Sequence, residues 1–268
     1  MNNRTFRLVA LLATSMLFHP AAQAQDAAKL AKDLANPIAS LISVPFQFNF
    51  ESDIGPLDQG SRLTTNVQPV IPISLNDDWN LISRTILPVV SQEDIFPGSG
   101  DQFGLGDTVQ SMFFSPKAPT SSGWIWGVGP VFLLPTATDD LLGADKWGAG
   151  PTAVVLKQSG PWTYGALANH IWSFAGDSDR KDISSTFLQP FISYTTPTAW
   201  TLAVNVEATR DWKAEQWNIP AIVSVSKVIR VGKQIMSIQA GPRYYLESTP
   251  NGPEGWAFRA TLTLMFPR

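Results

Sequence analysis

The sequence predicts an all-β fold, an antiparallel up-and-down transmembrane β-barrel of about twelve strands with a short N-terminal helix. First, the 268-residue chain is only 15% charged, whereas soluble domains average about 25%. Second, its mean hydropathy of +0.01 is too low for a bundle of membrane helices. Third, most of the chain alternates apolar and polar residues with a period of two, which is the pattern of strands with one apolar face.

Residues 1–24 have the pattern of a cleaved secretory signal. Arg4 and Arg7 supply positive charge, an apolar run follows, and Ala22-Gln23-Ala24 forms a small-x-small cleavage site. The run is too short for the alternative, a transmembrane anchor. The signal predicts export across the inner membrane, and together with the fold class it predicts the cell outer membrane as the location.

A periplasmic helical segment is predicted for residues 25–42, because apolar residues recur there on one helix face. These residues are Ala27, Leu30, Ala31 and Leu34. Pro37 is expected to end the helix. The barrel is predicted to occupy residues 43–268.

Twelve segments show the strand alternation. They are 44–50, 61–75, 78–90, 105–115, 123–134, 148–157, 161–173, 184–195, 199–210, 216–228, 233–246 and 255–266. In the last of them, Leu262 and Leu264 alternate with Thr261 and Thr263. Ten or fourteen strands are alternatives, because 105–115 and 184–195 alternate weakly.

The connections alternate between short turns and longer acidic loops, as in bacterial outer-membrane barrels. The longer loops are 51–60, 91–104, 135–147, 174–183, 211–215 and 247–254, and seventeen of the 22 acidic residues lie in or beside them. The strands between them carry little charge, which a lipid-facing wall requires. The rival folds, a soluble β-sandwich or a periplasmic lipid carrier, would scatter their acids over the exposed faces.

The ten Trp residues fall near two levels of the predicted barrel, and amphipathic rings favour membrane–water interfaces. The girdle at the short-turn end is predicted to contain Trp79, Trp124, Trp126, Trp162 and Trp200. The girdle at the loop end is predicted to contain Trp147, Trp172, Trp212, Trp217 and Trp256.

Prolines recur inside the predicted strands, often after Gly or Gln, although proline removes a ladder hydrogen bond. Examples are Gly129-Pro130, Gly150-Pro151 and Gly241-Pro242. We interpret these pairs as bulges or bends in the barrel wall.

Four blocks of the sequence resemble a proteobacterial outer-membrane transporter family. They are Asn36 to Pro45, Gln68 to Pro88 (QPVIPISLNDDWNLISRTILP), Phe103 to Asp107, and Gly127 to Gly150 (GVGPVFLLPTATDDLLGADKWGAG). The family is grouped with the barrel family of the meta-pathway of phenol degradation, and some members carry the misleading name neuromedin U. The resemblance covers essentially the whole mature chain and implies an outer-membrane β-barrel. It implies no catalytic or ligand residue, and the family's name does not identify a solute.

No catalytic residue is predicted, and we expect the chain not to be an enzyme. Cys is absent, which excludes thiol catalysis and thiolate metal sites. His170 is the strongest enzymatic candidate, because some outer-membrane hydrolases pair a barrel His with a Ser. Ser173 lies three positions away on the opposite strand face, and Ser178 lies in a loop. We therefore expect His170 to be a girdle or hydrogen-bonding residue.

No cofactor or metal is predicted. The groups Asp139-Asp140 and Asp177/Asp179/Asp182 could offer carboxylates to Ca²⁺, but the other ligands of a calcium loop are lacking, so solvated acidic loops are expected. The net charge of −3 argues against nucleic acid. The predicted partners are outer-membrane lipid, a small-molecule solute and, during biogenesis, the barrel-assembly machinery.

The polar faces of the strands predict the lumen lining, which sets selectivity in such barrels. The candidate lining residues are Arg84, Gln110, Gln189, Asn205, Glu207, Gln239, Arg243 and Arg259. An Arg on the lipid face costs about 2–4 kcal/mol, which favours the inward orientation. Arg243 and Arg259 are expected to form a basic patch near the outer mouth, partly neutralised by Glu207.

The predicted function is a passive channel or transporter for small solutes, aromatic or hydrophobic ones included. A sealed lumen would instead give a non-conducting structural or adhesion barrel whose acidic loops are the working part. The third hypothesis is a hydrolase that acts on outer-membrane lipid through His170.

Overall fold

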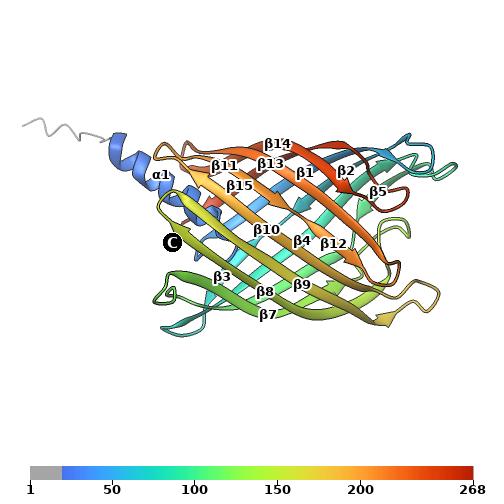
Figure 1. Cartoon of the computed structure of the whole chain (residues 1–268), viewed down its shortest axis with the longest axis horizontal. Coiled ribbons are helices and arrows are strands. Elements are labelled where there is room, and N and C mark those ends of the chain that lie inside the picture. Colours follow the sequence, from blue (N-terminus) through green and yellow to red (C-terminus); the bar gives the residue numbers. More distant parts are fainter. Residues whose placement is uncertain (1–19, 268) are drawn as a thin grey trace, which may run out of the picture.

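The computed structural model describes the backbone of residues 20–267 and the side chains of residues 26–267. It is a closed antiparallel β-barrel with a helix at one end (Figure 1). The elements are α1 (Pro20–Leu34), β1 (Ile42–Ile54), β2 (Gly60–Val67), β3 (Val70–Ser74), β4 (Trp79–Glu93), β5 (Asp101–Leu105), β6 (Thr108–Pro116), β7 (Trp124–Leu134), β8 (Lys146–Ser159), β9 (Trp162–Gly176), β10 (Ser184–Thr195), β11 (Trp200–Val206), β12 (Ala208–Asp211), β13 (Gln216–Val231), β14 (Gln234–Glu247) and β15 (Trp256–Phe266).

These segments make twelve barrel strands, because β2 with β3, β5 with β6, and β11 with β12 are each one strand with a short interruption. The barrel closes where β15 pairs with β1, from Ile42↔Phe266 to Phe50↔Phe258. The predicted twelve-stranded barrel is therefore confirmed. Its first strand is longer than the predicted 44–50, and the strand predicted at 105–115 begins earlier, with β5.

Helix α1 lies at the end of the barrel that carries the short turns (Figure 1). It runs from Pro20 to Leu34, and β1 begins at Ile42, so the helix begins within the predicted signal segment 1–24 and ends well before residue 42. Pro37 follows the helix end closely, as expected for a residue that cannot continue a helix. Within residues 20–267 no helix is both long and apolar enough to cross a bilayer. Residues 1–19, most of the predicted signal, lie outside the described residues, and cleavage after Ala24 stays a prediction.

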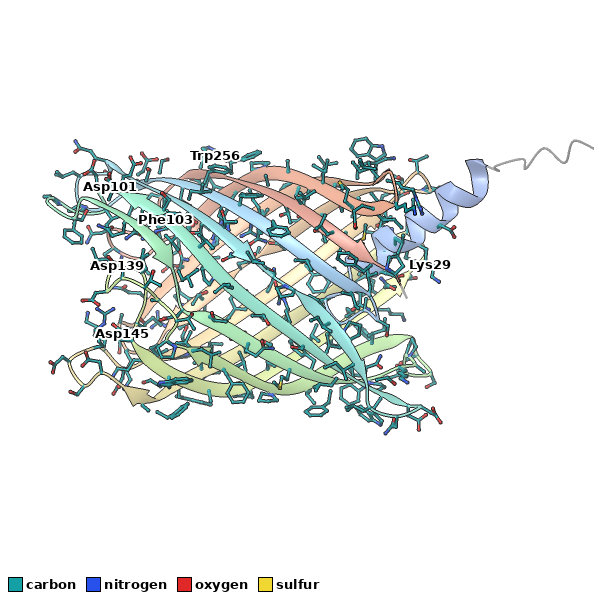
Figure 2. All side chains as sticks on the ribbon, turned by 180° about the vertical axis from the view of Figure 1, so that it is seen from behind. Lys29, Asp101, Phe103, Asp139, Asp145 and Trp256 are labelled. Atoms are coloured by element: carbon teal, nitrogen blue, oxygen red, sulfur yellow. The ribbon has the colours of Figure 1, made fainter. Side chains whose placement is uncertain are left out.

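The longer loops gather at the opposite end of the barrel. Figure 2 shows Asp101, Asp139 and Asp145 at that end, whereas Lys29 of α1 lies at the other. The acidic loop predicted at 91–104 is shorter in the structure, because β4 extends to Glu93 and β5 begins at Asp101.

At three Gly-Pro pairs the hydrogen bonding between neighbouring strands is interrupted. At Gly150-Pro151, pairing between β8 and β9 stops and then resumes in the same register, and Gly129-Pro130 and Gly241-Pro242 behave alike. No residue is inserted there, so these pairs are not bulges, and the alternative of a bend stays a prediction. A Cβ on Gly150 would lie 1.7 Å from the carbonyl oxygen of His170. Glycine thus permits a close backbone approach beside a proline that offers no N–H.

One side of the barrel interior is apolar. Buried side chains from β4, β6, β8 and β9 pack there against the segment that follows α1. They are Ile82, Phe113, Val154, Leu156 and Leu167, with Ile38 from that segment. This dry cluster fills part of the barrel and confines the polar space to the remaining part.

Trp side chains lie at or near the ends of the barrel strands. At the short-turn end Trp79 meets Trp126 edge-on, with ring centroids 5.8 Å apart. At the loop end Trp256 meets Tyr244 at 4.9 Å. The other predicted girdle residues at strand ends are Trp124, Trp147, Trp162, Trp172, Trp200, Trp212 and Trp217. Their contact with membrane interfaces remains a prediction.

Candidate solute pathway in the barrel lumen

Two cavities occupy the polar part of the lumen. The helix-side cavity, of about 240 Å³, is bordered by Ala31 and Leu34 of α1. The loop-side cavity, of about 410 Å³, lies beyond it toward the acidic loops. They adjoin at four shared lining residues: Gln47, Gln68, Arg84 and Gln189.

A third, linker cavity of about 150 Å³ lies beneath the segment that joins α1 to β1. It shares Gln68 and Arg84 with both larger cavities, and it shares Asp33 and Leu41 with an outer cavity of about 480 Å³ beside α1. The cavities therefore follow one another from the loop side, past Arg84, and around the linker to the helix end.

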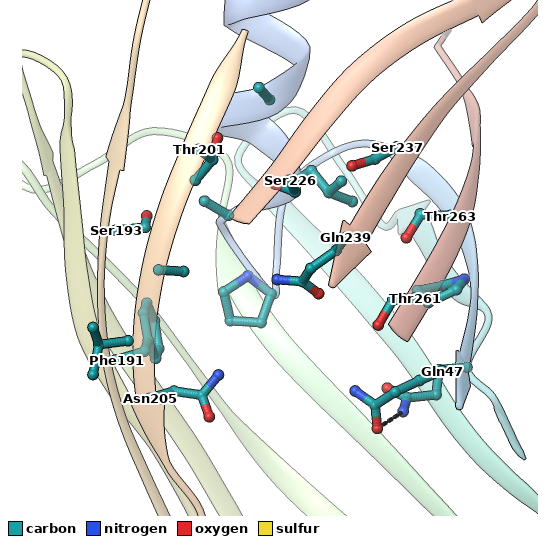
Figure 3. A pocket seen from close by; sticks show the side chains of 18 of the residues that line it. Gln47, Phe191, Ser193, Thr201, Asn205, Ser226, Ser237, Gln239, Thr261 and Thr263 are labelled. Carbon is teal, nitrogen blue, oxygen red and sulfur yellow. Dashed lines mark hydrogen bonds between the residues drawn. The ribbon is translucent and has the colours of Figure 1, made fainter. Parts of the chain in front are cut away.

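Seven of the eight predicted lining residues border the lumen cavities. They are Arg84, Gln189, Asn205, Glu207, Gln239, Arg243 and Arg259. Figure 3 shows Gln239 and Asn205 extending into the helix-side cavity.

Gln110 does not border these cavities, and its assignment to the lumen is wrong. Its strand neighbours Val109 and Ser111 line the loop-side cavity, so Gln110 faces outward between them. There it accepts a 2.6 Å hydrogen bond from Thr85 and donates one of 3.1 Å to Ser83. On the inner face, Ser111 and Phe113 take buried positions of this strand.

The loop-side cavity contains a network of buried ion pairs. Arg259 donates to both carboxylate oxygens of Glu207, at 2.6 and 2.8 Å. Arg243 donates to Glu51 at 2.6 Å and lies 3.9 Å from Glu207. The Tyr245 hydroxyl donates to the same Glu51 oxygen at 2.5 Å. Two Arg and two Glu neutralise one another, so the predicted basic patch is wrong.

Glu51 is a lumen-lining residue that the sequence interpretation missed. It was assigned to the acidic loop 51–60, but its side chain points into the barrel and is 8% exposed. The signal was present, because Gln47, Asn49 and Glu51 continue one polar face with a period of two.

Arg84 differs from the other two lumen arginines. Among the described residues, no carboxylate oxygen lies within 4.0 Å of its guanidinium. Within the described chain, its one side-chain hydrogen bond goes to Gln68 at 3.4 Å, which is long for such a bond. Arg84 is therefore an unpaired cation at the point where three cavities meet.

His170 faces outward, because its neighbours Asn169 and Ile171 line the lumen. Its Nδ1 lies 2.7 Å from the Thr186 hydroxyl, and its Nε2 lies 3.5 Å from the Ser184 hydroxyl. Ser173 instead donates to Asp182. Among the described residues, His170 makes no hydrogen bond to a carboxylate of the kind that orients a catalytic His.

The loop carboxylates considered for Ca²⁺ have local structural contacts. Asp139 and Asp177 each accept a 2.8 Å backbone hydrogen bond within their own loop. Asp182 forms an ion pair with Lys146 at 3.2 Å. In the described part of the chain, no group of three or more acidic or His side chains is placed to hold a metal ion.

Comparison with known proteins places the chain by its fold. No protein-family model matches the sequence, and no curated protein matches it either. The COG4313 outer membrane channel from Pseudomonas putida F1 is similar, with a TM-score of 0.66 and 17% identity over 84% of this chain and 94% of that chain. The outer membrane phospholipase A from Escherichia coli has a TM-score of 0.50 and 9% identity over 91% and 98%.

At these identities the likeness shows a shared fold, which is the β-barrel of bacterial outer-membrane proteins. It supports the outer-membrane barrel that the sequence resemblance implies, and it does not bear on the grouping with phenol degradation.

Proposed function

We propose that the protein is an outer-membrane channel through which small solutes pass passively. The observation that carries this proposal is the series of adjoining cavities past Arg84. The side chains shared by the two larger cavities are all polar, so this part of the lumen suits water and polar solutes. The fold shared with a protein described as an outer membrane channel supports the same function.

The cavities that would form the path are small. Ala31, Leu34 and Pro37 line the helix-side cavity, and the linker cavity shares Asp33 with the outer cavity beside α1. Volumes of about 150 Å³ in the linker cavity and 410 Å³ in the loop-side cavity suit small solutes and water.

Purified protein reconstituted in planar bilayers tests the proposal. We expect discrete conductance steps in KCl and uptake of a small neutral sugar into proteoliposomes. A heat-modifiable gel shift in outer-membrane fractions tests membrane insertion. A folded barrel with neither conductance nor uptake would instead support the structural or adhesion barrel.

A lipid hydrolase is the second candidate, and the 2.7 Å contact between His170 and the Thr186 hydroxyl favours it. Wild type and His170→Ala should be compared in phospholipase and deacylase assays, with Thr186→Val as a second variant. We expect equal background activity in all three proteins, because no carboxylate among the described residues is hydrogen-bonded to His170. Activity that is lost in both variants would establish the hydrolase.

A further inference from the structure

We propose that Arg84 is the centre of a binding site for a small monoanionic solute with a carboxylate group and a short apolar body. The inference rests on the proposed channel and names the class of solute that it selects. Its basis is the one uncompensated charge among the residues that line the two lumen cavities.

The charge balance singles out Arg84. The charged residues that border the helix-side and loop-side cavities are Arg84, Arg243, Arg259, Glu51 and Glu207. Arg243 and Arg259 are held by the two glutamates at 2.6 Å. One positive charge is left over in a confined space inside the barrel, where an anion is attracted more strongly than in bulk water. A dianion would bring one charge too many, so a monoanion fits best.

The guanidinium of Arg84 is free to bind. Its long contact with Gln68, 3.4 Å, occupies one nitrogen, Nη2. A guanidinium presents a planar fork of donors that matches the two oxygens of a carboxylate. Because Arg84 borders three cavities, a carboxylate bound there could arrive from the loop side and leave around the linker.

The helix-side cavity offers further polar contacts. Ser193 Oγ, Asn205 Oδ1 and Thr261 Oγ1 are buried and have no hydrogen-bond partner within the described chain. All three residues border this cavity (Figure 3). Buried polar atoms almost always have a partner, so water or a solute is expected to supply one here.

The same cavity also has an apolar wall. Phe191, Leu34, Val228 and Ala203 border it, and they can cover the hydrocarbon part of a solute. The volume of about 240 Å³ limits that part to a short chain or a single ring. The site therefore combines a cation, unpaired polar groups and an apolar surface, which suits a short monocarboxylate.

Calorimetry on the folded, detergent-solubilised barrel tests the site with four probes of similar size. These are butyrate, butyramide, n-butylammonium and succinate. We expect saturable binding of butyrate, weaker binding of succinate, and no measurable binding of the neutral amide or the cation. In planar bilayers, butyrate should reduce the chloride current at the concentrations at which it binds.

Three variants test whether Arg84 is the residue that binds butyrate. Arg84→Gln should weaken butyrate binding about tenfold or more, because a charge-assisted hydrogen-bond pair is lost. Arg84→Lys keeps the charge without the fork and should weaken binding less. Arg62→Gln is the control, since Arg62 contacts Gln92 at 2.9 Å and borders neither lumen cavity, so binding should change less than twofold. The heat-modifiable gel shift confirms that each variant is folded.

The possible results separate the two proposals. Butyrate binding that is equal in wild type and Arg84→Gln, or that falls equally in Arg62→Gln, overturns the site. Conductance without Arg84-dependent binding leaves the channel standing and removes the site. Arg84-dependent binding in a barrel that does not conduct supports the site and removes the channel.

Discussion

Replacing Glu207 with Gln is expected to destabilise the barrel strongly, because two arginines share this one carboxylate. Arg259 binds both of its oxygens at 2.6 and 2.8 Å, and Arg243 lies 3.9 Å away. Removing one partner from a buried ion pair costs about 3–5 kcal/mol. The Glu207 side chain is 16% exposed to the lumen, so water screens part of the loss, and we expect about 3 kcal/mol, the lower end.

Urea unfolding in lipid vesicles, followed by Trp fluorescence, measures this loss. Glu254→Gln is the matched control, because this exposed loop glutamate forms no ion pair within the described chain, and it should change stability by less than about 0.5 kcal/mol. Adding Arg259→Met to Glu207→Gln should recover part of the stability, since one orphaned charge is removed. The reasoning is refuted if Glu207→Gln is no more destabilising than Glu254→Gln.

Three further predictions follow from the wall, the helix and the loops. Gly150→Ala should lower the free energy of unfolding by about 1–3 kcal/mol in the same assay, because the new methyl group would overlap the His170 carbonyl oxygen. A Gly150→Ala variant as stable as wild type would contradict this. Burial raises the pKa of Asp33 above its ordinary 3.8, so the docked helix favours the protonated carboxyl. The resulting stabilisation of the docked helix is complete below the ordinary pKa and is lost as pH rises through the raised value. Hydrogen exchange of α1, corrected for intrinsic rates, should therefore be slower at acid pH. The Asp33→Asn variant should abolish this pH difference. A hydrogen bond and the positive charge of Lys146 lower the pKa of Asp182, so Lys146→Met should raise it in a carboxylate NMR titration, and an unchanged value would count against the ion pair.

The strand pattern was predictable because the outer face of a barrel must be apolar along its membrane-spanning length. In β15, Phe258, Leu262 and Phe266 lie on one face, and Arg259 and Thr261 on the other are buried in the barrel. Such a strand reveals both its type and its orientation. The helix signal was equally local, since Ala27, Leu30, Ala31 and Leu34 share one face and Pro37 follows closely.

The orientation of β6 was not predictable, because both of its faces mix apolar and polar residues. Phe113 is fully buried in the interior cluster, whereas the adjacent Phe114 is 42% exposed. Ser111 on the inner face and Gln110 on the outer face gave opposite cues, and the polarity of Gln110 indicated the wrong face. Only the position of β6 beside an apolar half of the lumen decides the orientation.

The charge of the lumen depends on pairings that the barrel creates between distant segments. Glu51 and Arg243 are 192 positions apart, and they meet because β15 joins β14 to β1 in the closed sheet. Sequence parity places Arg84, Arg243 and Arg259 inside, but it does not show which of them keeps its charge free. Arg243 and Arg259 form ion pairs with Glu51 and Glu207 that link strands near the loops. The anion selectivity that we propose therefore rests on Arg84, which lies where the cavities meet and forms no ion pair among the described residues.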